Sequence, residues 1–393
     1  MDILISGAGI AGLTSAYWLC QYGFSPTIVE RAPSLVVGGY KIDVRGTALE
    51  VLRKMDALDA VDAASTRMQG AMLVDRDGNV IGELSGDQFG HRVGDDLEIV
   101  RGTLCEILLA TAKGVDVIYD DVIESIEQSA DGADVTLRSG DRHRFDLVIG
   151  ADGLHSNVRR IVFGDESQFL RNLGMYLCVY SVPNYLDLDR TEMQYSEVGR
   201  IAQIWATLDD PNAKACFGFA VANRQIDLHD RGQQEDAVKE VYAGIGWEIP
   251  RLLALMPEAT DWYFDVAAQV DLPEFARDRV ALVGDAGYCA SPMSGQGSSL
   301  ALIGAYVLAG ELATASGDRA AAFAEYIQVM RPFITTNQQL GIESSKFMTQ
   351  DPDAAPSELS GSEIESHIDN STQSITAAAN AITLKDYSAY FSA

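Results

Sequence analysis

Three glycines near the N-terminus have the spacing of a turn that binds phosphate. They are Gly7, Gly9 and Gly12, in the pattern G-x-G-x-x-G. Gly7 permits a tight turn, Gly9 lets the backbone approach a pyrophosphate, and Gly12 allows a helix to pack closely on a strand. The N-terminus of that helix carries about half a positive charge and would face the phosphates. The pattern predicts a dinucleotide site, with Ala11 of the same turn as a further contact.

An acidic residue follows at the distance expected for the sugar of such a nucleotide. Glu30 ends the apolar run Pro26 to Val29 and lies 18 residues after Gly12. A carboxylate there can accept hydrogen bonds from both hydroxyls of an adenosine ribose and would repel a 2′-phosphate. The expected nucleotide is therefore FAD or NAD rather than NADP, with Arg31 as a neighbouring contact. The alternative is a glycine-rich turn without a ligand.

The elements around these residues have the order that the pattern needs. Ile3 to Ile5 reads as a strand, Leu13 to Tyr22 as a helix that ends at Gly23, and Pro26 to Val29 as a second strand. Together they cover about 30 residues, the context in which the glycine pattern becomes specific.

Two later segments end a strand on glycine and then turn at an aspartate. The first is "DLVIGADGLHSNVRR", which contains Asp152, and the second is "RVALVGDAGYCASPMSGQG", which contains Asp285. The loop after the second aspartate includes Pro292, Gly295 and Gly297. NAD alone would need only the N-terminal unit, so the two additional motifs favour FAD.

The three motifs together resemble those of the FAD-dependent aromatic hydroxylases, the single-component flavoprotein monooxygenases. The resemblance extends from residue 1 to about residue 335 and implies that the motifs of Asp152 and Asp285 surround one FAD. It also implies that Asp285 contacts ribityl or ribose hydroxyls and that the loop from Pro292 to Gly297 lies against the flavin pyrimidine. N–H donors and a helix dipole there would stabilise negative charge on reduced flavin.

A narrower resemblance is carried by "GGYKIDVRG", "LEIVRGTLCEIL", "SVPNYLDLD" and "GDAGYCASPMSGQG". These segments are similar to those of the tetracycline-inactivating flavin monooxygenases. The resemblance implies that Asp43 and Arg101 contact FAD and that Arg45 lies near flavin or substrate. Two sites depart from the common hydroxylases, which carry Ala and His at the positions of Gly287 and Tyr288 and Asp at the position of Gly304.

The expected activity is that of an FAD-dependent monooxygenase that uses NADPH or NADH and O2 to hydroxylate a polycyclic aromatic or enolic substrate. A tetracycline, and hence antibiotic inactivation, is the specific candidate. The alternatives are a biosynthetic polyketide or phenol hydroxylase and, in a different class, a flavin-binding module without turnover. Because the cofactor supplies the chemistry, no catalytic side chain is predicted. A second dinucleotide fold is absent, so the nicotinamide should bind transiently in the same cleft.

The segment from residue 170 to 230 reads as strands of one broad antiparallel sheet. Alternation places Phe217 and Phe219 on one face and Cys216 and Gly218 on the other. The two phenylalanines are the predicted substrate contacts, and the alternative is that they are core residues. Other candidates for the pocket are Met175, Tyr176, Tyr180, Gln203 and Trp205.

The expected fold class is α/β, with a Rossmann-like FAD-binding domain of the glutathione-reductase type, an antiparallel-sheet substrate domain and a C-terminal helical extension. The FAD-binding domain would comprise residues 1–70, 98–166 and 270–335. The substrate domain would comprise residues 71–97 and 167–269. Residues 336–393 would form the C-terminal helices. Their acidic segment would be either a solvated face or a helix that packs over the mouth of the pocket, as the resemblance implies.

Composition excludes several classes of partner. The chain has 29 Lys and Arg against 57 Asp and Glu, a formal net charge of -28, which would repel nucleic acid and anionic membranes.

Five cysteines without a C-x-x-C pair are typical of a reducing cytoplasm. The apolar run Leu300 to Leu308 is too short to span a bilayer. We expect a cytoplasmic monomer without a metal ion, since the five histidines lack ligand spacing.

One further motif suggests a competing activity. Trp247 in "GIGWEIP" matches half of the W-x-W-x-I-P signature of flavin halogenases, but Ile245 stands at the position of the first tryptophan. A halogenase is therefore the less favoured interpretation.

Overall fold

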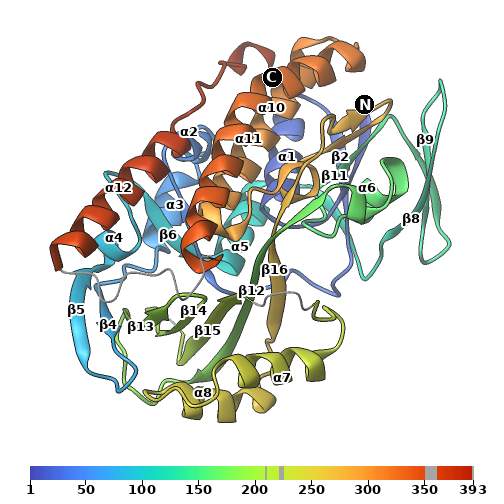
Figure 1. Ribbon diagram of the computed structural model, residues 1–393. Coiled ribbons are helices and arrows are strands. Elements are labelled where there is room, and N and C mark those ends of the chain that lie inside the picture. Colours follow the sequence, from blue (N-terminus) through green and yellow to red (C-terminus); the bar gives the residue numbers. More distant parts are fainter. Residues whose placement is uncertain (209, 221–224, 350–360, 392–393) are drawn as a thin grey trace.

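The computed structural model describes residues 1–208, 210–220, 225–349 and 361–391. Its chain forms two layers, one above the other in Figure 1. The upper layer is built on a six-stranded sheet and contains the long helices, and the lower layer is a seven-stranded sheet with helices α7 and α8 beneath it.

The sheet of the upper layer has the strand order β17-β18-β11-β1-β2-β7. All neighbouring strands in it are parallel except β17, which is antiparallel to β18. Strands of a parallel sheet are covered on both faces and therefore read as continuous apolar runs, as β1, β11 and β18 do. The bounds are β1 (Asp2–Ser6), β2 (Ser25–Glu30), β7 (Asp116–Tyr119), β11 (Leu147–Gly150), β17 (Ala276–Arg277) and β18 (Val280–Leu282).

Helices pack around this sheet, and two small sheets flank it. α1 contacts α5 and α10, and α10 contacts α2 and α11. The helices are α1 (Ile10–Gln21), α2 (Thr47–Lys54), α3 (Leu58–Ala63), α5 (Arg101–Thr111), α6 (Asn157–Val162), α9 (Asp285–Tyr288), α10 (Gly297–Thr314), α11 (Arg319–Thr349) and α12 (Gly361–Ala379). The small sheets are β3 (Lys41–Val44) with β6 (Leu97–Val100), and β8 (Ile123–Gln128), β9 (Ala133–Leu137) and β10 (Arg142–Phe145).

The sheet of the lower layer has the strand order β16-β12-β15-β14-β13-β4-β5 and is antiparallel except for the pair β13 and β4. Side chains alternate between its two faces, and one face packs on α7 and α8. The bounds are β4 (Gly70–Val74), β5 (Val80–Ser85), α4 (Gly86–Phe89), β12 (Leu170–Pro183), β13 (Thr191–Glu197), β14 (Arg200–Trp205), β15 (Asn212–Ala220), α7 (Arg231–Val241), α8 (Ile249–Leu255) and β16 (Tyr263–Val270).

Short 3₁₀ helices complete the structure at Glu166–Gln168, Met256–Glu258, Pro292–Ser294 and Ser388–Tyr390. The two large clusters of buried apolar residues belong mainly to one layer each. α11 runs without interruption across residues 335 and 336, where the predicted division into domains has a boundary.

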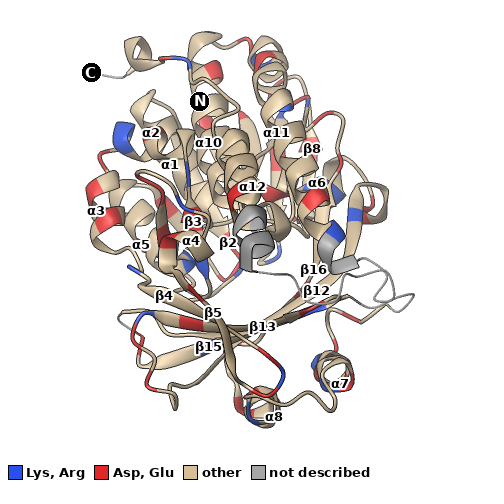
Figure 2. Cartoon of the chain, turned by 60° about the vertical axis from the view of Figure 1, so that its left-hand side comes forward, with Lys and Arg blue, Asp and Glu red and all other residues tan. Residues whose placement is uncertain are grey.

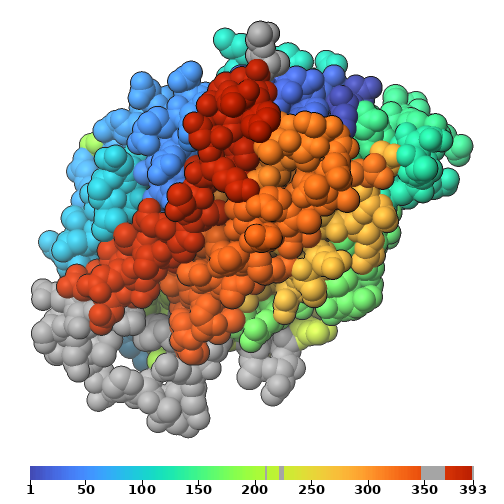
Figure 3. Space-filling model, turned by 90° about the horizontal axis from the view of Figure 1, so that it is seen from above, coloured from blue at the N-terminus to red at the C-terminus, as the bar shows by residue number. Residues whose placement is uncertain are grey.

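The segment after α12 returns to the upper layer. Tyr387 packs its ring against Gly310 of α10, and Phe391 stacks on Trp18 of α1 with ring centroids 6.2 Å apart. In the space-filling view the C-terminal residues, in red, lie beside the blue N-terminal segments and the orange helices (Figure 3). The chain therefore closes on its own first helix.

α10 is an apolar helix of 18 residues, longer than the run Leu300 to Leu308 seen in the sequence. By length and composition it could cross a membrane, and 83% of it is buried by neighbouring elements in this structure. The buried position is that of a central core helix.

Candidate active site

The N-terminal glycine turn is closed by direct contact with its neighbours. Gly7 has φ of +103°, and a Cβ placed on it would lie 2.6 Å from the carbonyl oxygen of Ala151. A Cβ on Gly12 would lie only 1.9 Å from the carbonyl oxygen of Gly7. Glycine is required at both positions, and the turn lies against the loop that contains Asp152.

Gly9 differs from these two glycines because space remains in front of it. Among the described residues, a Cβ on Gly9 would meet only the guanidinium of Arg101, at 3.5 Å. Arg101 begins α5, so the second of the predicted contact segments lies beside the first. Ala11 faces the third segment, with its Cβ 3.0 Å from the Cβ position of Gly284. The three segments of the predicted cofactor site therefore lie side by side.

Three helix N-termini in this region have no side-chain cap. α1, α5 and α10 begin without a capping side chain and without an acidic residue in the first turn. α1 has no charged residue and α10 has only Glu311, so both are tan along most of their length in Figure 2. The first two N–H groups of α5 already donate to the carbonyl oxygens of Tyr40 and Gly38, at 3.0 and 2.8 Å. In a chain of net charge -28, the N-termini of α1 and α10 offer N–H donors and a positive dipole end to an anionic ligand.

Glu30 and Arg31 lie at the end of β2, next to the glycine turn. The Glu30 carboxylate accepts hydrogen bonds from the backbone N–H groups of Ala8, at 2.7 Å, and Ala32, at 2.9 Å. The carboxylate therefore points at the turn, as a ribose-binding group would. Arg31 is exposed beside it.

Asp152 organises the start of α6. It accepts hydrogen bonds from the hydroxyl of Ser156, at 2.5 Å, and from the N–H of Val158, at 3.1 Å. Burial raises the pKa of its carboxyl group. The buried Arg159 of α6 then donates to the carbonyl oxygen of Ala286, at 2.9 Å. The loop of Asp152 is thereby joined to the loop of Asp285.

Asp285 lies at the start of α9, after Gly284 with φ of +65°. Its Oδ1 atom is 3.9 Å from the Cβ position of Gly297, the first residue of α10, and burial raises the pKa of its carboxyl group. Pro292 and Gly295 are exposed in the loop between them. The motif residues thus surround the N-terminus of α10.

Gln296, just before α10, carries a buried amide that lacks partners. It is fully buried, and neither its oxygen nor its nitrogen has a hydrogen-bond partner among the described residues. Buried polar groups are normally hydrogen-bonded. An orphaned amide beside open helix N-termini and an open glycine cradle fits a site built for a polar, anionic cofactor.

Asp43 and Arg45 belong to a buried network of charges. Arg45 pairs with Asp43 at 2.8 Å and donates to the carbonyl oxygens of His91 and Gly90 at 2.7 and 2.5 Å. Burial raises the pKa of Asp43, although the Arg45 guanidinium opposes that rise. Arg45 is consequently held by protein groups on several sides.

The same network joins the two layers. Arg92 pairs with Glu98 at 2.9 Å, Lys41 lies 3.4 Å from Glu98, and Lys41 pairs with Glu192 of β13 at 2.7 Å. Glu192 is 1% exposed, and its burial raises the pKa of its carboxyl group. The ammonium of Lys41 also lies 5.7 Å from the ring centroid of Trp205. β3 is thereby fixed to the lower sheet.

The face of the lower sheet that meets the upper layer is lined by a mixed set of side chains. Trp205, Val179 and Cys216 cluster with Tyr40 and Tyr263. The rings of Tyr40, just before β3, and Tyr263, on β16, are 5.3 Å apart.

Beside this cluster, the amide of Gln203 donates to Gln194 at 2.6 Å. Met175 forms a separate apolar cluster with Ile201 and Met293, and Met293 comes from the loop between α9 and α10. The face therefore combines aromatic, amide and thioether groups.

A family model described as an FAD binding domain matches residues 1–323. The chain belongs to this FAD-binding family. A flavin-dependent monooxygenase from an unknown prokaryotic organism is 45% identical over 351 residues, which cover 89% of this chain and 91% of the relative.

Two solved structures of tetracycline destructases are also similar. Tet(55) is 41% identical with a TM-score of 0.90 and covers 98% of both chains. Tet(51) is 36% identical with a TM-score of 0.87 and covers 98% of this chain and 99% of its own.

These comparisons confirm the predicted family, the α/β fold with C-terminal helices, the monooxygenase activity and FAD as the cofactor of this flavin-dependent monooxygenase. FAD fits the residues present, since the glycine cradle, the open helix N-termini and the Gln296 amide offer N–H donors at one place.

Phe217 and Phe219, the predicted substrate contacts, lie on the other face of the monooxygenase's lower sheet. Both are fully buried, and the ring of Phe217 meets Tyr242 edge-on at 4.7 Å. The predicted alternation is present, with Cys216 on the opposite side. The alternation of side chains along a strand does not tell which face of the lower sheet meets the upper layer. The face is decided by where α7 and α8 pack.

Tyr40, Tyr263 and Gln194 lie on the face of the lower sheet that carries Gln203, and the sequence did not single them out. Tyr40 lies inside the segment "GGYKIDVRG", so the resemblance of that segment was an available signal. Tyr263 and Gln194 gave none, because their facing depends on the register of distant strands.

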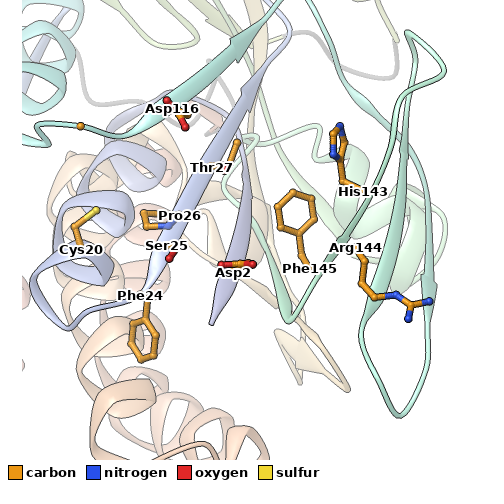
Figure 4. Close-up of a pocket in the computed structure, with 11 residues that line it drawn as sticks. Asp2, Cys20, Phe24, Ser25, Pro26, Thr27, Asp116, His143, Arg144 and Phe145 are labelled. Atoms are coloured by element: carbon orange, nitrogen blue, oxygen red, sulfur yellow. The ribbon is translucent and has the colours of Figure 1, made fainter.

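The monooxygenase also has a surface cleft of about 470 Å³ at some distance from these motifs. Figure 4 shows its lining, which includes Asp2, Asp116, Phe24 and Arg144. Asp2 and Asp116 are the first residues of β1 and β7. Because ligands of such sheets bind at the carboxyl ends of the strands, this cleft lies at the opposite end from the flavin motifs.

Proposed function

We propose that this monooxygenase hydroxylates a polycyclic aromatic or enolic compound, specifically a tetracycline, with NADPH or NADH as transient reductant. The observation that carries the proposal is the mixed face of Gln194, Gln203, Met175, Tyr40 and Tyr263 directly opposite the flavin motifs. A flat molecule with alternating carbonyl, enol and amide groups needs apolar contact over its rings and amide donors at its edge. The likeness to tetracycline destructases over 98% of the chain supports that choice.

The chain's own residues would bind and orient the cofactor. The turn of Gly7, Gly9 and Gly12 and the side chain of Arg101 would hold the pyrophosphate, and Glu30 the adenosine ribose. Asp285 would bind the ribityl or ribose hydroxyls. Bound FAD supplies electron transfer from the nicotinamide and activation of O2.

The N-terminus of α10 would serve the chemistry electrostatically. Pro292 and Gly295 are exposed in the loop that precedes α10, and α10 begins without a side-chain cap. A positive dipole end there would stabilise negative charge on reduced flavin. Asp43 would contact FAD, and its partner Arg45, 2.8 Å away, would lie near flavin or substrate.

The proposed substrate position is the face of Gln203 rather than that of Phe217 and Phe219. Packing on α7 gives the two phenylalanines a core role in this structure. The enzyme is proposed to act as a monomer in the cytoplasm, where its cysteines would stay reduced.

The test is a panel of tetracyclines and of simpler phenols incubated with the purified holoenzyme, NADPH and air. We expect stimulated NADPH oxidation and a product heavier by one oxygen with at least one tetracycline. Gln203→Leu should raise KM for that substrate about tenfold, whereas Gln339→Leu, at an exposed position of α11, should leave KM unchanged.

Stimulation by phenols alone, with no tetracycline changed in mass, would instead support a biosynthetic hydroxylase. Oxidation of NADPH that no compound stimulates would contradict both assignments of substrate.

A further inference from the structure

A tyrosine ends α9, the short helix that Asp285 begins. The common aromatic hydroxylases that this chain resembles have histidine at that position. This residue, Tyr288, is 1% exposed and points away from the surface into the core. Its hydroxyl occupies space next to α10. A Cβ placed on Gly304 would lie 1.8 Å from the Tyr288 hydroxyl oxygen and 3.0 Å from its Cζ. The glycine on α10 and the tyrosine on α9 are therefore two parts of one arrangement.

The Tyr288 hydroxyl is hydrogen-bonded to a second buried tyrosine. Its oxygen is 2.9 Å from the hydroxyl oxygen of Tyr326 on α11. The Tyr326 hydroxyl donates its only proton to the carbonyl oxygen of Leu282, at 3.0 Å. It follows that Tyr288 is the donor in the bond between the two tyrosines, because Tyr326 has no second proton to give.

The ring of Phe275 fixes the orientation of both tyrosines. It meets Tyr288 at 5.2 Å and 68°, and Tyr326 at 5.1 Å and 87°. Edge-to-face contacts of this kind favour one ring orientation. Both hydroxyls are thereby held where the hydrogen bonds need them.

The two hydrogen bonds join the ends of one short loop. Leu282 is the last residue of β18, and Tyr288 is the last residue of α9, so the segment between them contains Gly284 and Asp285. Inside it, the N–H groups of Gly287 and Tyr288 both bind the carbonyl oxygen of Gly284, at 3.0 Å. A rigid loop of this kind fixes where its carboxylate side chain starts.

We propose that Tyr288 and Tyr326, given room by Gly304, are positioning residues that hold Asp285 in place to bind FAD. The inference rests on the proposed role of Asp285 in the flavin site. The pair acts only through the loop, since both hydroxyls are used within the core. It also gives the departure at residue 304 a physical cause, because a longer side chain there would displace the Tyr288 hydroxyl.

The first experiment measures FAD release from the diluted holoenzyme by the fluorescence of free flavin. Tyr326→Phe removes both hydrogen bonds of the pair and should raise the FAD dissociation constant at least tenfold, with a shifted visible band of the bound flavin. Tyr306→Phe is the matched control, since its hydroxyl on α10 donates instead to the backbone carbonyl oxygen of Lys385. It should lower the melting temperature and leave the FAD dissociation constant within twofold.

The second experiment tests the shared space. Gly304→Ala should weaken FAD binding strongly in the natural background and far less when combined with Tyr288→Leu, which vacates the space. Equal effects of Gly304→Ala in the two backgrounds would show that the contact is not what requires glycine.

The outcomes distinguish a failure of the positioning role of the two tyrosines from a failure of the proposed FAD site. If Tyr326→Phe lowers the melting temperature as the control does but binds FAD normally, the pair is merely structural and the proposal is overturned. If the natural protein itself binds no FAD, the proposed site fails with it. Should Tyr326→Phe not fold, Tyr288→Phe, which keeps the bond from Tyr326 to Leu282, is measured in the same way and must weaken FAD binding.

Discussion

Single charged side chains in this enzyme link its upper and lower layers through ion pairs. His155 is the clearest example. Its Nε2 atom lies 3.1 Å from Asp265 on β16, and its Nδ1 atom lies 3.0 Å from Glu166. The hydrogen bond to Asp265, helped by the one to Glu166, raises the pKa of His155 to about 9. His155 follows Asp152 in the same motif, so the imidazolium links the upper layer to the lower sheet.

This raised pKa predicts a pH-dependent contribution to stability. The charged imidazolium stabilises the fold fully below the unfolded pKa of about 6.5, and that contribution is lost as the pH rises through about 9. We expect the melting temperature of the natural protein to exceed that of His155→Gln at pH 6.5 and to equal it at pH 10. The exposed His143→Gln is the control, and a difference that stays constant with pH would contradict the assignment.

At the scale of elements, buried ion pairs join the two layers at a place where apolar packing is more usual. Lys41 on β3 and Glu192 on β13 are 151 positions apart in the sequence, and their side chains meet at 2.7 Å. Removing one partner of a buried pair leaves an uncompensated charge, whereas removing both can be nearly neutral.

The Lys41 and Glu192 pair therefore predicts a non-additive result. Lys41→Met should destabilise the protein by about 3–5 kcal/mol in urea unfolding, and the double variant Lys41→Met with Glu192→Leu should recover most of that loss. An additive double variant would mean that the ion pair contributes independently at each end. The control is Arg67→Met, which breaks an exposed pair with Asp62 and should cost less than about 1 kcal/mol.

The elements also show where sequence reasoning was sufficient. The glycine turn and Glu30 could be predicted because a strand, a tight turn and a helix are encoded within a few neighbouring residues. The position of Asp285, in a turn directly after β18, could be predicted for the same reason, and its contact with FAD stays a prediction. The layer that covers Phe217, and the pairing of Lys41 with Glu192, could not be predicted, because both depend on contacts between segments far apart in the chain.

At the scale of the whole molecule, the C-terminal segment holds several elements together. Thr372 of α12 lies 3.0 Å from the ring of His91, and the carbonyl oxygen of Ile382 accepts from Thr47 of α2 at 3.2 Å. Beyond them, the Tyr387 hydroxyl donates to Glu311 of α10 at 2.6 Å, and Lys385 pairs with the same carboxylate at 2.8 Å. α12 is thus anchored at its C-terminal end.

That anchor predicts a measurable effect far from the flavin. Tyr387→Phe removes a hydrogen bond to the buried Glu311 carboxylate and should lower the free energy of unfolding by about 1.5–3 kcal/mol. The exposed Tyr390→Phe should leave it unchanged. Urea titration followed by tryptophan fluorescence reports both, and equal stabilities would argue against the anchor.

The order of the central strands in the upper sheet has a consequence for synthesis on the ribosome. β1 pairs with β11, which in turn pairs with β18, so the central strands of the upper sheet emerge far apart in time. At roughly 5–20 residues per second, more than ten seconds separate the appearance of β1 from that of β18. During that interval the nascent β1 and α1 lack β18 and α10, which complete the sheet and cover α1 in the folded protein.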